Sequence, residues 1–137
     1  MKTRSTFIHI FIITVVLVIL LSGCDFSNVK IGEVRLMYGD SDDSHMSYNF
    51  KAFTGSESER VEVLAGQTII FEYEVVVDKG SVVIEWQNPT GAVVWRESLA
   101  ENGRGGEEIA IDSAGKYALI VQGKGAAGSF DVSWDIK

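Results

Sequence analysis

The sequence predicts an all-β fold: an antiparallel β-sandwich of jelly-roll-like topology with eight or nine strands. Three observations predict it. Apolar and polar residues alternate with a period of two in most segments after residue 30, and turn-type sequences rich in Gly, Asp, Asn and Ser separate these segments. No segment combines a helical period with helix caps. Strands at such short spacing close most simply as two antiparallel sheets whose apolar faces meet.

The alternation is clearest in the segment 69–77, where Phe71, Tyr73 and Val75 share one predicted face. The other expected strands are 34–38, 46–52, a short strand beginning at Val61, 82–87, 92–98, 108–111, 116–122 and 129–136. The expected turns between them are 39–44, 54–59, 78–80, 88–91, 101–106, 112–115 and 123–128.

The turn sequence NPTG suggests how one hairpin is paired. A four-residue loop would place Trp86 opposite Val93 and Ile84 opposite Trp95 on a single apolar face. A three-residue loop with a glycine bulge would slip the register by one and place Trp95 beside Glu85. Burial of the two tryptophans favours the four-residue loop, because a one-residue slip exchanges core and solvent faces.

The final segment, SAGKYALIVQGKGAAGSFDVSWDI, combines a Gly-x-Tyr entry into a strand, a glycine-rich turn and an alternating last strand. This arrangement resembles the closing hairpin of GOLD-type domains and of pre-peptidase C-terminal domains. The resemblance implies a jelly-roll fold and a role in binding or assisting other proteins, and it implies no site. The alternation itself predicts that one set of side chains faces inward: Tyr117, Leu119, Val121, Phe130, Val132, Trp134 and Ile136.

The first 24 residues have the features of a targeting segment. Lys2 and Arg4 precede an apolar run over residues 7–21, which is shorter than the 18 or so residues that indicate a membrane-spanning helix. The run ends in Leu21-Ser22-Gly23-Cys24, which resembles the lipobox of bacterial lipoproteins and holds the only cysteine of the chain. An ordinary signal peptide or an uncleaved membrane anchor is the alternative interpretation.

The lipobox resemblance implies that Cys24 carries diacylglycerol and that the chain is cut after Gly23. Residues 1–23 are then a signal peptide, residues 24–30 a lipidated tether and residues 31–137 the β-sandwich domain. Two or more acyl chains make membrane attachment stable, whereas one chain leaves it reversible. The expected location is the extracytoplasmic face of the cell membrane, where a chain with one cysteine forms no intrachain disulfide.

The charge of the mature chain narrows the choice of partner. Loss of Lys2 and Arg4 leaves 10 of the 12 basic residues against 19 acidic ones, a formal charge of −9. Such a surface as a whole disfavours nucleic acid and anionic lipid headgroups and favours a basic envelope protein. The acidic positions expected to attract such a partner lie in two predicted turns: Asp40, Asp42 and Asp43 in the first, and Glu57 and Glu59 in the second.

The sequence contains little that indicates catalysis. His45 is the one histidine of the mature chain and is expected as a solvated residue in or beside an acidic turn, without the orienting group that nucleophilic catalysis needs. The pairs Glu72 with Glu74 and Asp131 with Asp135 are expected on outward faces of strands. No catalytic residue, cofactor or metal site is therefore predicted.

Two binding alternatives stay open beside the main prediction. Asp40, Asp42 and Asp43 could supply oxygen ligands to calcium, although their spacing lacks the glycine and the final glutamate of an EF-hand loop. Exposed tryptophans could stack on sugars, but all three share predicted faces with aliphatic residues and are expected in the core: Trp86, Trp95 and Trp134. The predicted function is a lipid-anchored, non-enzymatic binding or accessory module for an envelope protein or wall component. A calcium- or carbohydrate-binding module, or an enzyme with an unrecognised site, is the alternative.

Overall fold

A computed structural model describes residues 34–137 of the chain, and every regular element in this range is a strand. The strands are β1 (Val34–Ser41), β2 (His45–Val63), β3 (Thr68–Gln87), β4 (Val93–Leu99), β5 (Gly103–Ala110) and β6 (Gly115–Ile136). No helix within these residues is long and apolar enough to cross a membrane. The predicted signal peptide, residues 1–23, and the predicted tether, residues 24–30 with Cys24, lie outside the described residues.

The strands form the two antiparallel layers of a sandwich. The first sheet has the order β1, first half of β2, second half of β6, first half of β3 and β5. The second sheet has the order second half of β2, first half of β6, second half of β3 and β4. Without β1, each sheet has four strand segments in the order of a jelly roll, which confirms the predicted fold class.

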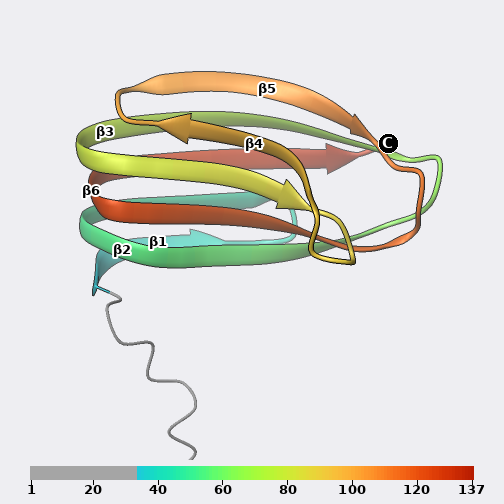
Figure 1. The fold of residues 1–137 in the computed structure, drawn as a ribbon, viewed down its shortest axis with the longest axis horizontal. Coiled ribbons are helices and arrows are strands. Elements are labelled where there is room, and N and C mark those ends of the chain that lie inside the picture. Colours follow the sequence, from blue (N-terminus) through green and yellow to red (C-terminus); the bar gives the residue numbers. More distant parts are fainter. Residues whose placement is uncertain (1–33) are drawn as a thin grey trace, which may run out of the picture. The chain divides into compact units, whose positions relative to one another are not determined.

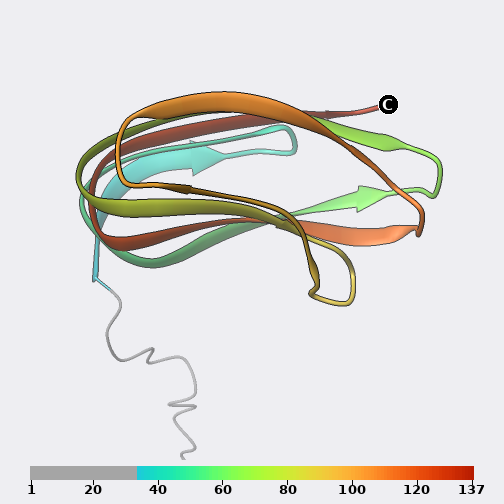
Figure 2. The same cartoon turned by 45° about the horizontal axis from the view of Figure 1, so that its top comes forward.

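The prediction of eight or nine separate strands is wrong, because three strands run continuously from one sheet into the other. β2, β3 and β6 each turn back at the same end of the domain (Figures 1 and 2), within sequences that resemble ordinary turns. Glycine permits two of these bends. Gly80 has φ +73° and a Cβ there would lie 2.4 Å from the Gly125 carbonyl oxygen. Gly128 has φ +139° and a Cβ there would lie 1.9 Å from the Val76 carbonyl oxygen.

The core lies between the two sheets and confirms the inward faces predicted for residues 69–77 and for the closing segment. Its largest fully buried side chains include Trp86, Phe53, Phe71 and Phe130. Tilted and edge-on ring contacts connect these aromatics, among them Trp86 with Trp134 at a centroid distance of 6.0 Å. In the closing strand β6 the inward set is Tyr117, Leu119, Val121, Phe130, Val132 and Trp134, which are buried, and Ile136, which packs against the core.

The predicted register of the β3–β4 hairpin is wrong in both of its forms. Trp86 pairs with Trp95, and the register shifts before Gln87 pairs with Val93. The turn itself is organised by Asn88, whose Oδ1 accepts hydrogen bonds from Thr90 and from the backbone N–H of residue 92. This bonding leaves one extra residue in β4, and the resulting bulge keeps both tryptophans on the core side.

Candidate functional site

The outer face of the first sheet carries a shallow groove of about 740 Å³ across β6, β3 and β5. Side chains that alternate with core residues line it, so their direction follows from the strand pleat. Gly106 on β5 pairs with Glu72 on β3, and its missing side chain deepens the groove at that point. We call this feature the acidic groove; its lining residues are Ile70, Phe71, Glu72, Tyr73, Glu74, Arg104, Gly105, Gly106, Glu107, Glu108, Asp131 and Ser133.

The acidic groove holds five carboxylates and one guanidinium, Arg104. The side-chain ion pairs within residues 34–137 are Arg35–Glu57, His45–Asp131 and Arg96–Glu85. None of these pairs involves Glu72, Glu74 or Glu108, and all three of these side chains are exposed. The groove therefore presents negative charge that the described part of the chain does not neutralise, beside the partly buried aliphatic side chain of Ile70.

The strand order, which the sequence does not reveal, brings the predicted carboxylate pairs together. Glu72 pairs with Ser133 and Glu74 with Asp131, so both members of the first predicted pair and Asp131 of the second line the same groove. Arg104 pairs with Glu74 across β3 and β5. The alternation of β3 and β6 was the signal for Glu72, Glu74 and Asp131. Arg104 lies in a predicted turn, 101–106, whose last four residues form half of β5, whereas Glu108 begins the predicted strand 108–111.

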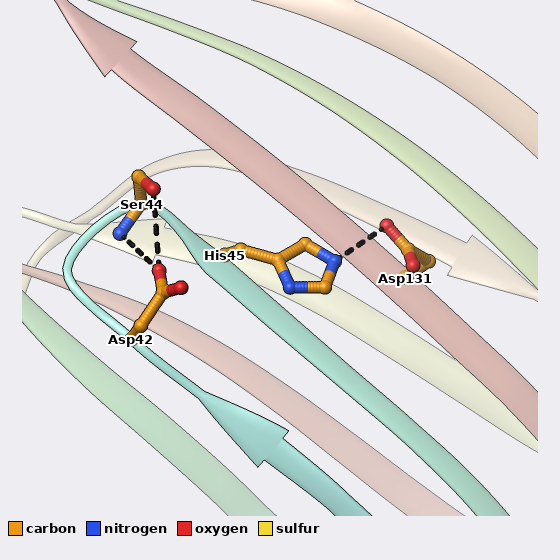
Figure 3. A network of polar contacts seen from close by, with 4 residues as sticks. All are labelled: Asp42, Ser44, His45 and Asp131. Atoms are coloured by element: carbon orange, nitrogen blue, oxygen red, sulfur yellow. Dashed lines mark hydrogen bonds and ion pairs between the residues drawn. The ribbon is translucent and has the colours of Figure 1, made fainter.

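His45 is the first residue of β2 rather than a turn residue, and it borders the groove. Figure 3 shows its ring pointing across the sheet toward Asp131, with Nε2 and Oδ1 3.1 Å apart. The two side chains are 36% and 56% exposed, so water surrounds much of this pair. An exposed pair of this kind lacks the buried, oriented environment that activates a general base.

The acidic turn between β1 and β2 is organised by its own carboxylate. Asp42 Oδ1 accepts hydrogen bonds from the Ser44 backbone N–H at 2.8 Å and from the Ser44 hydroxyl at 3.2 Å (Figure 3). The backbone hydrogen bond is the main cause that lowers the pKa of Asp42 below its usual value. Within residues 34–137 no three His, Cys, Asp or Glu side chains are grouped so that they could hold a metal ion.

The prediction of a second acidic turn at 54–59 is wrong, because Glu57 and Glu59 lie within β2. They lie at a spacing of two from the buried Val61 and Val63, so they share the inward face of the strand, where their partners are on β1. Arg35 donates to the Glu57 carboxylate, and the Ser41 hydroxyl donates to Glu59 Oε2 at 3.2 Å. These contacts join β1 to the half of β2 that belongs to the second sheet, so the two carboxylates have a structural role at the edge of the sandwich.

The second sheet has a different outer face, on which Glu85 is only 3% exposed. Its Oε1 accepts a hydrogen bond from Gln87 Nε2 at 2.7 Å and a longer one from Gln122 Nε2 at 3.4 Å. Arg96 Nη1 lies 3.9 Å from Oε2. Since the buried carboxylate has these partners, the cluster is a closed polar network rather than an open site.

The tryptophans do not provide a sugar-stacking surface. Trp86 and Trp134 are buried and Trp95 is partly buried, with its ring against Phe71 and Tyr73. All three therefore pack in or against the core, as predicted from the alternation. The acidic groove accordingly offers charged and polar groups, with no exposed tryptophan face among its lining residues.

No protein-family model and no curated protein matches the chain. Similar solved structures include a CBM4 protein, with 10% identity over 71% of this chain and 72% of that one and a TM-score of 0.47. A carbohydrate-binding module of Cellvibrio mixtus lichenase 5A, in complex with cellotriose, has 16% identity over 77% and 85% and a TM-score of 0.42. The Aeromonas hydrophila periplasmic inhibitor of g-type lysozyme has 17% identity over 72% and 93% and a TM-score of 0.43. At these identities the similarity concerns the β-sandwich fold alone.

Proposed function

We propose that this protein is a lipid-anchored, extracytoplasmic binding module whose acidic groove binds a cationic segment of an envelope protein. The observation that supports the proposal is the set of exposed carboxylates, Glu72, Glu74 and Glu108, without ion-pair partners in the described residues. They project from neighbouring strands of one sheet, which fixes their spacing. A lysine- or arginine-rich segment would supply the missing positive charge and could lay its methylene groups on Ile70.

The ionisable side chains of the groove suit binding better than catalysis. The groove's carboxylates are exposed, whereas a glycosidase acid needs a raised pKa, which usually comes from burial. The His45–Asp131 pair is exposed as well. Binding through the field of several charges needs neither condition, and such fields raise association rates in a salt-dependent way.

The binding partner is tested with a fluorescent oligolysine peptide and fluorescence anisotropy at increasing salt. The groove variant combines Glu72→Gln, Glu74→Gln and Glu108→Gln. Exposed ion pairs contribute about 0.5 kcal/mol each, so loss of three should weaken binding about tenfold. The dependence on salt should flatten as well, because fewer charges are screened.

The matched control changes the net charge equally at exposed positions outside the groove: Glu62→Gln, Glu101→Gln and Asp112→Asn. We expect this control to bind the peptide nearly as well as the original chain. Equal loss in both variants would mean that only net charge matters. No loss in the groove variant would show that cations bind elsewhere, and either result contradicts the proposed site.

The proposed location depends on the sequence features of residues 1–24. A lipid on Cys24 would hold the module at the membrane, and its acidic excess would attract basic proteins. We therefore expect Cys24→Ala to abolish incorporation of a fatty-acid analogue, an experiment that also serves the test in the next section.

A further inference from the structure

Strand β1 exposes two large apolar side chains on the edge of the first sheet. Leu36 is 64% exposed and Tyr38 is 74% exposed, while Met37 between them packs against the core. Both therefore point outward by the strand pleat. Edge strands of soluble proteins usually carry charged or otherwise protective side chains, so exposed apolar residues here indicate a contact surface.

The charge around these side chains is opposite to that of the chain as a whole. A shallow hollow of about 340 Å³ beside them is lined by Arg35, Leu36, Met37, Tyr38, Asn49 and Lys51. It contains two cations and no carboxylate, and of the two cations Arg35 is paired with Glu57. Lys51 is exposed and forms none of the ion pairs of residues 34–137. We call Leu36, Tyr38 and Lys51 the β1 patch.

The length of chain before β1 limits how far this surface can lie from the lipid. Val34 is ten residues after Cys24 in the sequence, and an extended chain spans at most about 3.6 Å per residue. A lipid on Cys24 would therefore keep the start of β1 within about 36 Å of the bilayer. β1 is the first described strand after this segment, so a lipid on Cys24 would limit the distance of β1 from the bilayer more tightly than that of the strands that follow.

We propose that the β1 patch is a second membrane contact, in which Leu36 and Tyr38 enter the headgroup region and Lys51 lies near lipid phosphates. Tyrosine suits this boundary because its ring is apolar and its hydroxyl is polar. The inference rests on the proposed lipidation of Cys24.

Membrane contact at β1 would also orient the proposed binding site. The acidic groove lies on the same outer face, over β6, β3 and β5, with β2 between it and β1. Anionic headgroups attract Lys51 of the patch and repel the carboxylates of the groove, so the domain would tilt with the groove away from the bilayer. The groove would then stay open to a partner in solution.

The test uses the lipidated mature chain in vesicles of phosphatidylcholine and phosphatidylglycerol. Because Cys24 is the only native cysteine and lipid would block its thiol, Leu36→Cys introduces one free thiol for an environment-sensitive fluorophore. Leu64→Cys is the matched control, since Leu64 is 63% exposed and lies after the far end of β2. We expect a blue-shifted emission and severalfold stronger quenching by headgroup-nitroxide lipids at position 36 than at position 64.

The control measurements separate failure of this inference from failure of the anchor. Mass spectrometry of the chain and of Cys24→Ala establishes whether Cys24 carries the lipid, and urea unfolding establishes that Leu36→Cys folds like the original chain. Lipidated chain with equal, water-like signals at both positions overturns the membrane contact and leaves the anchor intact. Absence of lipid on Cys24 overturns both. Loss of the position-36 signal in Lys51→Glu would support the contact with anionic headgroups.

Discussion

The two halves of β3 carry outward carboxylates with opposite surroundings. Glu74, in the first sheet, is exposed and has no ion-pair partner within residues 34–137, whereas Glu85, in the second sheet, is buried under Gln87, Gln122 and Arg96. Both positions point away from the core by the same strand pleat. A side chain that points away from the core is therefore not always exposed to solvent. Long polar side chains cover the outer face of the second sheet around Glu85, whereas glycines on β5 leave the outer face of the first sheet open.

The largest expected effect on stability comes from a change in the bends at which the strands pass from one sheet to the other. Gly128→Ala would force a side chain against the Val76 carbonyl at a φ that disfavours alanine. Strain and overpacking together should cost about 3 kcal/mol or more of the free energy of unfolding, measured with urea. Gly66→Ala is the matched control, because Gly66 also has positive φ but a Cβ there meets nothing within 4 Å. Similar losses in the two variants would contradict the close packing of the bend.

A smaller effect should separate the two carboxylates themselves. Glu85→Ala removes the acceptor of two glutamine amides and the partner of Arg96, so we expect a loss of about 2 kcal/mol in unfolding free energy. Glu74→Ala should cost no more than about 0.5 kcal/mol, as exposed substitutions usually do. Oligolysine affinity should respond in the reverse order. If Glu74→Ala destabilises the domain as much as Glu85→Ala, the contrast between the two faces is wrong.

The smallest expected effect is a change in the pH dependence of stability, which comes from Tyr73 at the edge of the core beside β5. Burial, with the charges of Glu97 and Glu107, raises the pKa of the Tyr73 hydroxyl above its usual value. The folded state then holds this proton more tightly than the unfolded state. The resulting stability is present below a pH of about 10 and is lost as the pH rises through the raised pKa. We expect Tyr73→Phe to lose less stability than the original chain between neutral and strongly alkaline pH; parallel curves would contradict the shift.

The alternation of side chains was enough to predict the fold class and most of the core. Phe71, Val75, Leu119 and Val132 belong to segments in which apolar residues repeat at a spacing of two, and they are buried as expected. The number of strands was not predictable, because a sequence such as GKGAAG has the composition of a turn whether a strand ends there or bends. The register shift after Trp86 was not predictable either, because the hydrogen bonds of the Asn88 side chain decide the hairpin register.

The sequence predicted the direction of the groove side chains within each strand, but not which strands lie side by side. The sequence placed Glu72, Glu74 and Asp131 on outward faces, and the structure confirms that they are exposed. It did not show that Asp131 lies opposite Glu74 or that Arg104 lies on its other side, because strand order depends on long-range packing. Glu57 and Glu59 were assigned to a turn because nothing local reveals their partners, Arg35 and Ser41, on another strand.

The position of β6 has a consequence for how the chain acquires its structure. This strand is the last of the six in order along the chain, yet it lies between β2 and β3 in both sheets. Neither sheet can connect its two sides before this segment has been synthesised, and nearly all of its pairings are distant in sequence. The domain must therefore remain largely open until β6 is available to pair with both β2 and β3.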